Sequence, residues 1–203
     1  MSFTMRRGKN FFRPGACGWV LLSVAWAMCG VVQAAEQWSV SRLMAQLGKT
    51  QARQYAYVEK KYVSFLKKPK ISRGTLVYRA PATLEKNMAF PKQNRYRIVD
   101  NKLYIQKQGK QERQVQLHNY PELLILSESL VATFSGKQQV LEKYYQITLE
   151  GDRTAWKLVL KPTNAELAEQ IKRVEIYGND RALQRVVIKE QDGDKSDLTI
   201  TAQ

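Results

Sequence analysis

Few residues in this chain have side chains that could perform catalysis, and they are scattered. The only histidine is His118, which follows an alternating segment and precedes a long apolar one. A lone histidine cannot form a zinc site, because such sites take three or four protein ligands. Ser127 and Ser129 could join His118 in a hydrolytic site, although the sequence contains no nucleophile-elbow motif. An esterase centred on His118 stays open as an alternative, and loss of hydrolysis in His118→Ala would support it.

Acidic residues and glycines give no further catalytic signal. Glu85, Glu112 and Glu122 show no pairing that suggests acid–base chemistry. No glycine-rich phosphate loop is present, and Gly151-Asp152 is typical of a hairpin turn. The sequence therefore predicts a binding module and not an enzyme, with no cofactor and no metal ion.

Residues 1–34 have the features of a cleaved secretory signal peptide. An apolar run over residues 16–32 follows a basic start, and the small side chains of Val32 and Ala34 fit a cleavage site before Ala35. The basic start consists of Arg6, Arg7, Lys9 and Arg13. These features predict export to the periplasm and a single mature domain over residues 35–203.

Two other interpretations of this segment stay open. A transmembrane anchor needs about 20 apolar residues, and the run here is shorter. Lipidation at Cys29 needs a small residue before the cysteine, where this chain has Met28. Both cysteines, Cys17 and Cys29, lie in the segment. The mature domain would therefore have no disulfide, no thiol nucleophile and no thiolate metal site.

The chain is strongly basic, with a formal net charge of +15, and only four of its cations lie in the signal segment. An exported protein meets little nucleic acid, so we expect no nucleic-acid partner. It would meet anionic lipid headgroups, which attract a basic patch by about 1 kcal/mol per nearby lysine or arginine. The alternative is that most lysines form the solvated outer face of a sheet, because they alternate with apolar residues.

Most of the chain from Tyr55 onward alternates apolar and polar residues, which is the period of a half-buried strand. Short strands joined by hairpin turns predict an antiparallel sheet that curls into a barrel or half-barrel. The expected turns are Asp100-Asn101, Gly109, Gly151-Asp152, Gly178-Asn179 and Asp192-Gly193.

Two segments have helical spacing instead. The first runs from Ser39, which can serve as an N-cap, to Gly48. The second, Tyr120–Gly136, is apolar around most of its circumference and must be buried on more than one side. We expect it to pack against the concave face of the sheet, either as an ordinary core helix or as a lid over an apolar cavity.

From about Trp38 to Ile200 the chain resembles the periplasmic outer-membrane lipoprotein carrier family (LolA-like), as a divergent member. The resemblance lies in the order and spacing of several motifs. They are the aromatic strand YAYVEKKYVSF, the Gly74–Leu76–Pro81 strand end, Pro91, the DNKLYI hairpin, the PELLILSESLVATFSG helix, the WKLVLKP strand and the closing strands IKRVEI and LQRVVIKEQDGDKSDLTI.

The resemblance implies an α+β, mostly β fold: a curved, incomplete antiparallel β-barrel (half-barrel) whose concave face is covered by helices. It also implies a periplasmic carrier that shields the acyl chains of a lipoprotein or related lipid in an apolar cavity and moves it toward the outer membrane. The donor would be an inner-membrane exporter, and the acceptor would lie at the outer membrane. We expect a monomer.

Two positions depart from the family pattern. In the lipoprotein carriers an arginine stands directly before the first of the two prolines, bonds to the lid and helps set its open and closed states. This chain has Ala80 there, and the neighbouring Arg79 would point to the opposite face of the strand. Lys86 occupies a position that often carries a tryptophan. The handoff switch is therefore altered, and the cargo could be a glycolipid, a fatty acyl pigment or a polyketide-like lipid.

The predicted ligand contacts are the inward apolar positions of the strands together with the apolar helix, and we expect them to line one cavity. They are Tyr57, Leu76, Tyr78, Leu84, Met88, Leu103, Ile105, Leu123, Leu126, Leu130, Phe134, Trp156 and Leu158. The competing function is a non-carrying envelope subunit that docks on membrane or on a partner protein through its basic sheet. Docking predicts salt-sensitive binding to anionic vesicles, whereas carriage predicts acyl binding that salt does not weaken.

Overall fold

One open antiparallel sheet organises the part of the chain that the computed structural model describes, residues 38–49, 52–180 and 182–203. The segment predicted as a signal peptide, with its two alternatives, lies outside the described residues. The strands are β1 (Ala52–Tyr62), β2 (Lys70–Arg79), β3 (Thr83–Phe90), β4 (Asn94–Val99), β5 (Lys102–Lys107), β6 (Arg113–Gln116), β7 (Tyr145–Gly151), β8 (Trp156–Pro162), β9 (Ile171–Asn179), β10 (Ala182–Glu190) and β11 (Lys195–Ala202).

Among the described residues, one helix precedes β1, three helical segments connect β6 to β7, and one helix connects β8 to β9. They are α1 (Val40–Leu47), the 3-10 turn η1 (Leu117–Asn119), α2 (Pro121–Ser135), α3 (Gln138–Glu142) and α4 (Ala165–Gln170). None of these described helices is long and apolar enough to cross a bilayer.

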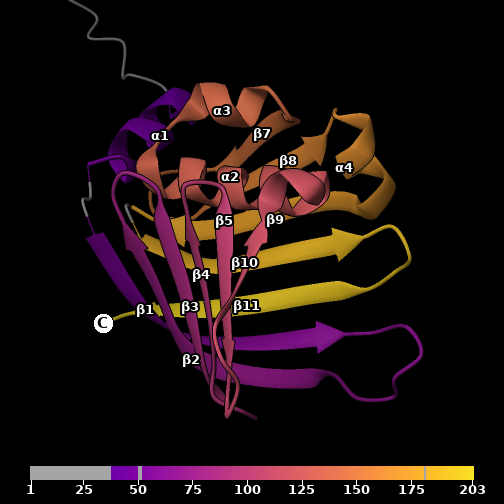
Figure 1. The fold of residues 1–203 in the computed structure, drawn as a ribbon. Coiled ribbons are helices and arrows are strands. Elements are labelled where there is room, and N and C mark those ends of the chain that lie inside the picture. The colour runs from indigo at the N-terminus through magenta and orange to yellow at the C-terminus, as the bar shows by residue number, and fades with distance from the viewer. Residues whose placement is uncertain (1–37, 50–51, 181) are drawn as a thin grey trace, which may run out of the picture. The chain divides into compact units, whose positions relative to one another are not determined.

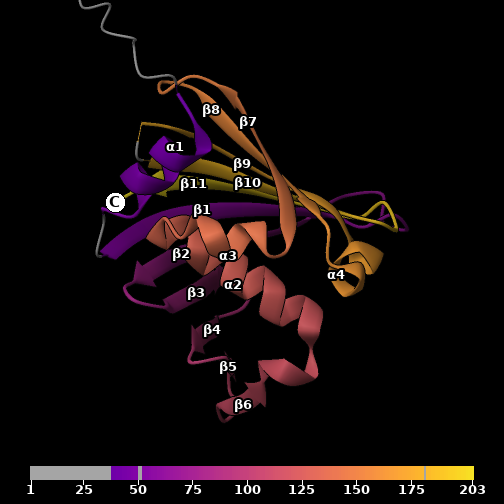
Figure 2. The same ribbon diagram turned by 90° about the horizontal axis from the view of Figure 1, so that it is seen from above.

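The sheet is a continuous run of hairpins with one exception. Its order is β6-β5-β4-β3-β2-β1-β11-β10-β9-β8-β7, so the first strand pairs with the last and the other neighbours follow each other along the chain. β6 and β7 form the two edges, and the sheet does not close. Figures 1 and 2 show the sheet curving around α1, α2 and α3, which lie on its concave side. The predicted half-barrel with helices covering the concave face is confirmed.

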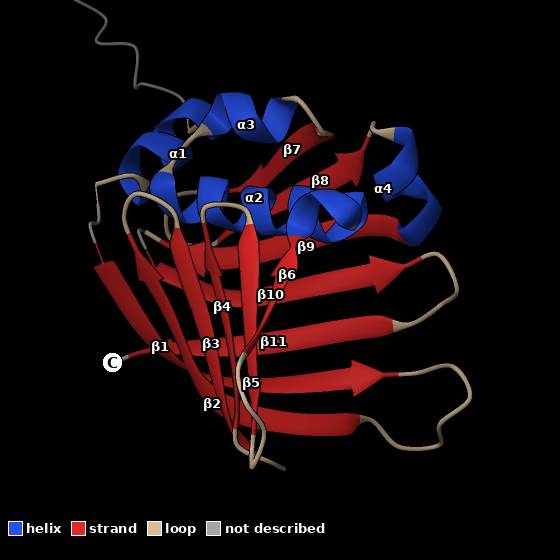
Figure 3. Cartoon of the chain, viewed as in Figure 1, coloured by secondary structure: helices blue, strands red, loops and turns tan. Residues whose placement is uncertain are grey.

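The pairing register assigns side chains to the two faces. Tyr55 and Tyr78 contact Phe134 of α2, so residues in register with them face the helices, and this is the concave face. Alternate residues along each strand point to the convex face. Figure 3 shows that the helices gather at one end of the strands, so they cover only part of the concave face.

Several strands end at the turn residues that the sequence predicted. Asp100 and Asn101 adopt positive φ between β4 and β5, and Gly193 does so between β10 and β11. Positive φ at both central residues matches the twist of a two-residue hairpin. Ser39 caps α1 by accepting the Arg42 N–H.

The turn predicted at Gly178-Asn179 is wrong by about two residues, because β9 continues through both. Gly178 lies against Trp156, and a Cβ there would meet the Trp156 ring at 2.3 Å. This glycine admits an indole ring and does not turn the chain. The short helices α3 and α4 were not predicted, because segments of five and six residues carry too little periodicity.

Gly136 ends α2 in the left-handed conformation, with φ 69°. A Cβ at this position would meet the Met44 carbonyl oxygen at 2.2 Å and the Gly48 nitrogen at 2.7 Å. The glycine therefore lets the end of α2 approach the end of α1, in addition to providing the backbone turn.

We expect Gly136→Ala to lower the free energy of unfolding by about 3 kcal/mol or more, since it combines left-handed strain with a backbone clash. Gly109→Ala is the matched control, because Gly109 has φ 70° and no atom within 4 Å of its built Cβ. The control should cost only about 1 kcal/mol. Urea denaturation measures both, and equal losses would contradict the packing role of Gly136.

Candidate ligand-binding site

Phe134 fixes α2 to the concave face. Its ring is stacked on Tyr78 at a centroid distance of 5.4 Å and tilted against Tyr55 at 6.0 Å. All three side chains are buried. Aromatic pairs at these separations stabilise beyond the area they bury, so this trio holds the helix against β1 and β2.

Most of the predicted contact residues belong to one hydrophobic core around this trio. Tyr57, Leu76, Tyr78, Leu84, Phe134, Trp156 and Leu158 are buried in it, and Leu126 and Leu130 pack against it. Ile105 is buried on β5, Met88 and Leu103 are half-buried, and Leu123 is 42% exposed on the first turn of α2. Their contact with a ligand stays a prediction.

A cavity of about 500 Å³ lies where α2 and α3 meet the ends of β3 and β4. This volume falls in the range of small-molecule sites. Its lining comes from Ala82, Ile98, Asp100, Asn101, Ser127, Glu128, Val131, Ala132, Lys137, Val140 and Lys143. The predicted contact residues are not among them.

The cavity nevertheless adjoins the predicted row. Ile98 pairs directly with Leu84 on one side and with Leu103 on the other, so the three side chains share the concave face. The hairpin signal at Asp100-Asn101 already implied the Ile98–Leu103 pairing. Extending the row by one strand would have found Ile98 from the sequence.

The cavity has apolar walls and a polar rim. Ala82, Ile98 and Val131 supply apolar surface. On the rim, the Glu128 carboxylate accepts a hydrogen bond of 2.9 Å from the Tyr144 hydroxyl. An arrangement of this kind suits a ligand with an apolar body and a polar end.

A polar pair interrupts the concave face away from the helices. The Lys86 ammonium donates to the Glu59 carboxylate at 2.6 Å. The hydroxyls of Ser72 and Ser196 donate to the same carboxylate at 2.9 and 2.7 Å. Burial alone would raise the pKa of Glu59, but Lys86 and the two serines outweigh it and hold the pKa below its usual value.

Tyr57 borders this pair. The Lys86 ammonium lies 5.0 Å from the centre of the Tyr57 ring, a cation–π distance. Burial raises the pKa of Tyr57 to about 12. Its hydroxyl is buried and has no hydrogen-bond partner within the described residues. The concave face therefore has an apolar zone under α2 and a polar zone around Lys86, the position where the sequence departs from the family tryptophan.

The second departure is also visible. Arg79 points to the convex face, where its guanidinium lies 3.8 Å from the Glu85 carboxylate. It cannot replace an arginine at Ala80 that would reach the lid. Ala82, two residues on, lines the cavity instead.

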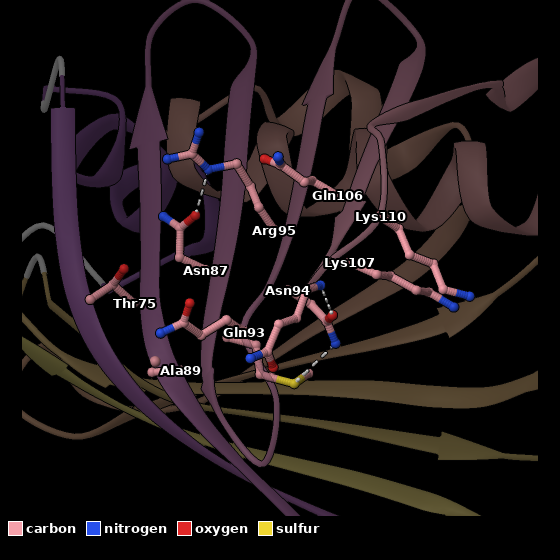
Figure 4. A pocket seen from close by; sticks show the side chains of 13 residues that line it. Thr75, Asn87, Ala89, Gln93, Asn94, Arg95, Gln106, Lys107 and Lys110 are labelled. Atoms are coloured by element: carbon pink, nitrogen blue, oxygen red, sulfur yellow. Dashed lines mark hydrogen bonds between the residues drawn. The ribbon is translucent and has the colours of Figure 1, made fainter.

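A second hollow, of about 510 Å³, lies on the convex side of β2–β5 (Figure 4). Arg95, Asn87 and Gln106 project into view there, with the Arg95 guanidinium donating to Asn87 at 2.9 Å. Met88 is the one predicted contact residue among its lining. Its surface is polar and basic, so it does not suit an acyl chain.

The two serines considered for a hydrolytic site form hydrogen bonds within α2. Ser127 and Ser129 donate to backbone carbonyls of α2, and Ser129 also contacts the Tyr145 hydroxyl at 3.0 Å. His118 is exposed in η1, and no hydrogen bond in the described part of the chain joins it to either serine.

We expect Lys86→Met to lower the free energy of unfolding by about 2 kcal/mol, because it leaves the Glu59 charge largely buried without its partner. The double variant Glu59→Leu with Lys86→Met should recover most of this loss, since the pair disappears together. Chemical denaturation of the three proteins measures the difference. A double variant less stable than Lys86→Met would contradict the pairing.

Glu175 on the convex face should govern part of the acid sensitivity. Burial would raise its pKa, but hydrogen bonds from Lys189, Arg173 and Tyr177 lower it to about 2. A depressed folded-state pKa contributes stability above pH about 4.5 and loses it as the pH falls toward 2. In thermal melts between pH 4.5 and 2, the melting temperature of Glu175→Gln should fall less with decreasing pH than that of the wild type. The exposed Glu169→Gln is the control, and an equal change in both variants would contradict the assignment.

A family model for "Outer membrane lipoprotein carrier protein LolA-like" matches residues 32–202. A search of curated proteins found no match. Similar solved structures include a LolA superfamily protein from Nitrosomonas europaea, with 9% identity, a TM-score of 0.45, and coverage of 81% of this chain and 92% of that chain. The MucA/MucB complex of Pseudomonas aeruginosa has 12% identity, a TM-score of 0.45, and coverage of 80% and 55%. LprF from Mycobacterium bovis has 14% identity, a TM-score of 0.37, and coverage of 80% and 91%.

The family assignment rests on the family match alone, because the structural likenesses are too distant to support an argument about function. That match extends from before α1 to the end of β11 and so includes every described strand. The chain therefore belongs to the LolA-like family of outer-membrane lipoprotein carrier proteins.

Proposed function

We propose that the protein is a periplasmic carrier that shields the acyl chains of a lipoprotein or related lipid and moves them toward the outer membrane. One observation supports this most directly: an apolar helix, α2, lies on the concave face of an open sheet and borders a cavity of about 500 Å³. Family membership supports the same function.

The physical reason is the cost of carrying an acyl chain through water. Each CH₂ gains about 0.8 kcal/mol on burial, so a chain leaves a membrane readily only for another apolar surface. We place the acyl chain between α2 and strands β2–β5, entering at the cavity near Ala82 and Ile98. Displacement of α2 would extend this path along the predicted residues Leu76, Leu84 and Leu103.

The polar zone around Lys86 on the concave face suggests which class of cargo the protein carries. Lys86 has ammonium protons beyond the one directed at Glu59, and the Tyr57 hydroxyl is unpartnered among the described residues. Both could meet an oxygen atom of a cargo that carries polar groups next to its acyl chains. This supports a glycolipid, a fatty acyl pigment or a polyketide-like lipid beside lipoprotein as cargo.

Native mass spectrometry with lipid extraction, on mature protein purified from the periplasm, tests the carrier function. A co-purifying acyl lipid or lipoprotein is the expected result, and it identifies the cargo class at the same time. An apo mass together with failure to bind added lipids would overturn the proposal. The same spectra report whether the protein is a monomer.

Charge placed in α2 should abolish binding of an apolar fluorescent probe. We expect Leu126→Glu to weaken binding by tenfold or more, because the probe would then face a buried carboxylate. Gln139→Glu, which adds the same charge at an exposed position of α3, should bind as the wild type does.

A second variant keeps this test decisive if Leu126→Glu fails to fold. Ala82→Trp fills the cavity from its apolar wall without adding charge, and we expect a similar loss of probe binding with circular dichroism unchanged. Unaltered binding in folded Leu126→Glu and Ala82→Trp would place the ligand elsewhere.

A non-carrying envelope subunit is the second candidate. The observation that favours it is the convex face, where arginines and lysines surround Glu85 and Glu175. Such a subunit would bind anionic vesicles or an acidic partner in a salt-sensitive way and would bind no acyl probe.

A further inference from the structure

Large apolar side chains that reach solvent occur along the second half of β1, in the β1–β2 loop, at the start of β2 and at the end of β3. Phe65 is 81% exposed and Phe90 is 51% exposed, whereas a typical large apolar side chain of this sheet is buried. We call this group the apolar tip, and it consists of Val58, Tyr62, Phe65, Leu66, Ile71 and Phe90. Among the described residues, the only other large apolar side chains exposed to this degree are Tyr120 and Leu123 at the start of α2.

The strand register brings Val58, Ile71 and Phe90 close together, and Tyr62, Phe65 and Leu66 follow Val58 along the end of β1 and into the β1–β2 loop. Val58 is opposite Arg73, which is in turn opposite Phe90, so these three form a row across β1, β2 and β3. Ile71 belongs to the next row along β2, opposite Lys60. Figure 1 shows the β1–β2 loop projecting from the sheet, away from α1, α2 and α3.

Cations are interspersed with these apolar side chains. The Lys195 ammonium lies 4.2 Å from the centre of the Tyr62 ring, and the Arg73 guanidinium lies 5.6 Å from that of Phe90. The cations of this end are Lys60, Lys67, Lys68, Lys70, Arg73, Lys92 and Lys195, and all but Lys195 are exposed.

Nearby carboxylates do not cancel this charge. Glu190 pairs with Lys61 at 3.3 Å, and the largely buried Asp194 accepts the Ser64 N–H at 2.8 Å, which ties the β1–β2 loop to the β10–β11 turn. Asp192 is exposed and accepts the Asp194 N–H. Asp192 and Asp194 keep their negative charges, and Lys195 lies 3.9 Å from Asp197. The seven cations and Lys61 make eight positive charges against these four carboxylates, so a surplus of positive charge remains around the apolar tip.

We propose that the apolar tip is a docking surface for an anionic lipid bilayer. Phe65 and Leu66 enter the interfacial region, and the surrounding lysines contact lipid phosphates. Exposed apolar side chains that lie near one another and are surrounded by polar residues often mark interaction sites. Aromatic rings favour the interfacial region of a bilayer, and flexible lysines keep their charge at its surface while their stems contact apolar atoms. A projecting hairpin loop can reach a bilayer without any strand leaving the sheet.

This inference goes beyond the proposed function, because it concerns which surface meets the membrane and not what the cavity holds. It also differs from docking through the convex sheet face as a whole. A lipid surface fits better than a protein partner, because the cations come from several strands and from the β1–β2 loop and are mixed with apolar side chains, which suits a surface of many phosphates above an apolar layer.

Co-sedimentation with vesicles of phosphatidylglycerol and phosphatidylcholine, compared with phosphatidylcholine alone, tests the proposal on the mature protein. We expect binding to the anionic vesicles that falls as salt is added. Phe65→Ser should weaken it by about tenfold, and Lys67→Gln with Lys68→Gln should weaken it and reduce its salt dependence. The matched controls are Tyr120→Ser and the pair Lys49→Gln with Lys161→Gln, which lie outside the tip and should bind as the wild type does.

A reporter variant adds a direct reading of depth. Phe65→Trp should shift its emission to shorter wavelength on anionic vesicles, because the indole leaves water. Absence of vesicle binding by the wild type, no effect of Phe65→Ser, or equal loss in the controls would each overturn the proposal. Binding to an acidic polypeptide with the same dependence on Phe65, without vesicle binding, would assign the tip to a protein partner and overturn it too.

These experiments distinguish failure of the docking surface from failure of the carrier function. Phe65→Ser should leave acyl-probe binding unchanged, since Phe65 is remote from the cavity lining. If the wild type binds anionic vesicles but no acyl probe, the carrier function is contradicted and the docking surface is still supported.

Discussion

An open sheet must have its concave face covered, and in this protein α2 provides most of that cover. A half-barrel has a large apolar face that cannot be buried against a second sheet, so a helix has to bury it and be buried by it. Phe134 between Tyr55 and Tyr78 makes this contact, and Gly136 lets the far end of α2 meet α1. The cavity exists because this cover is incomplete where α2 and α3 pass the ends of β3 and β4.

The concave face is divided by chemistry as well as by cover. Beneath α2 it is aromatic and aliphatic, whereas beyond the helices it holds the Glu59–Lys86 pair with two serine hydroxyls. The Glu59 carboxylate already accepts three hydrogen bonds, while the Lys86 ammonium has three N–H donors and directs one of them at Glu59, so the zone has more free donors than free acceptors. Ala80 offers no charged group at the position of the family arginine, and the contact seen between α2 and the concave face is the aromatic packing of Phe134 on Tyr55 and Tyr78.

Much of the fold could be predicted because its signals are local. Turn residues such as Asp100-Asn101 and the apolar surface of α2 can be recognised from neighbouring residues, and they predicted a curled antiparallel sheet with a buried helix. That the barrel is incomplete was implied by the family resemblance. The Glu59–Lys86 pair could not be predicted. It joins β1 to β3 across β2, and its formation depends on how these three strands align, which short sequence patterns do not reveal. Gly178 was misread, since a glycine that accommodates Trp156 has the same letter as one that turns the chain. For the site, the predicted contacts stay a prediction: none of them lines the cavity, Ile98 of that lining pairs with two of them, and Leu123 is exposed.

The pairing of β1 with β11 has a consequence for the order of events in folding. These strands are separated by nearly the whole described chain, and their ladder is the sole strand pairing that joins β1–β6 to β7–β11. Contacts between residues so distant in sequence form late and slowly. The first half of the sheet therefore keeps an open edge on β1 until the last strand has been made. Unpaired strand edges favour pairing with other chains, so a protein built in this way is most prone to aggregation before β11 has been added.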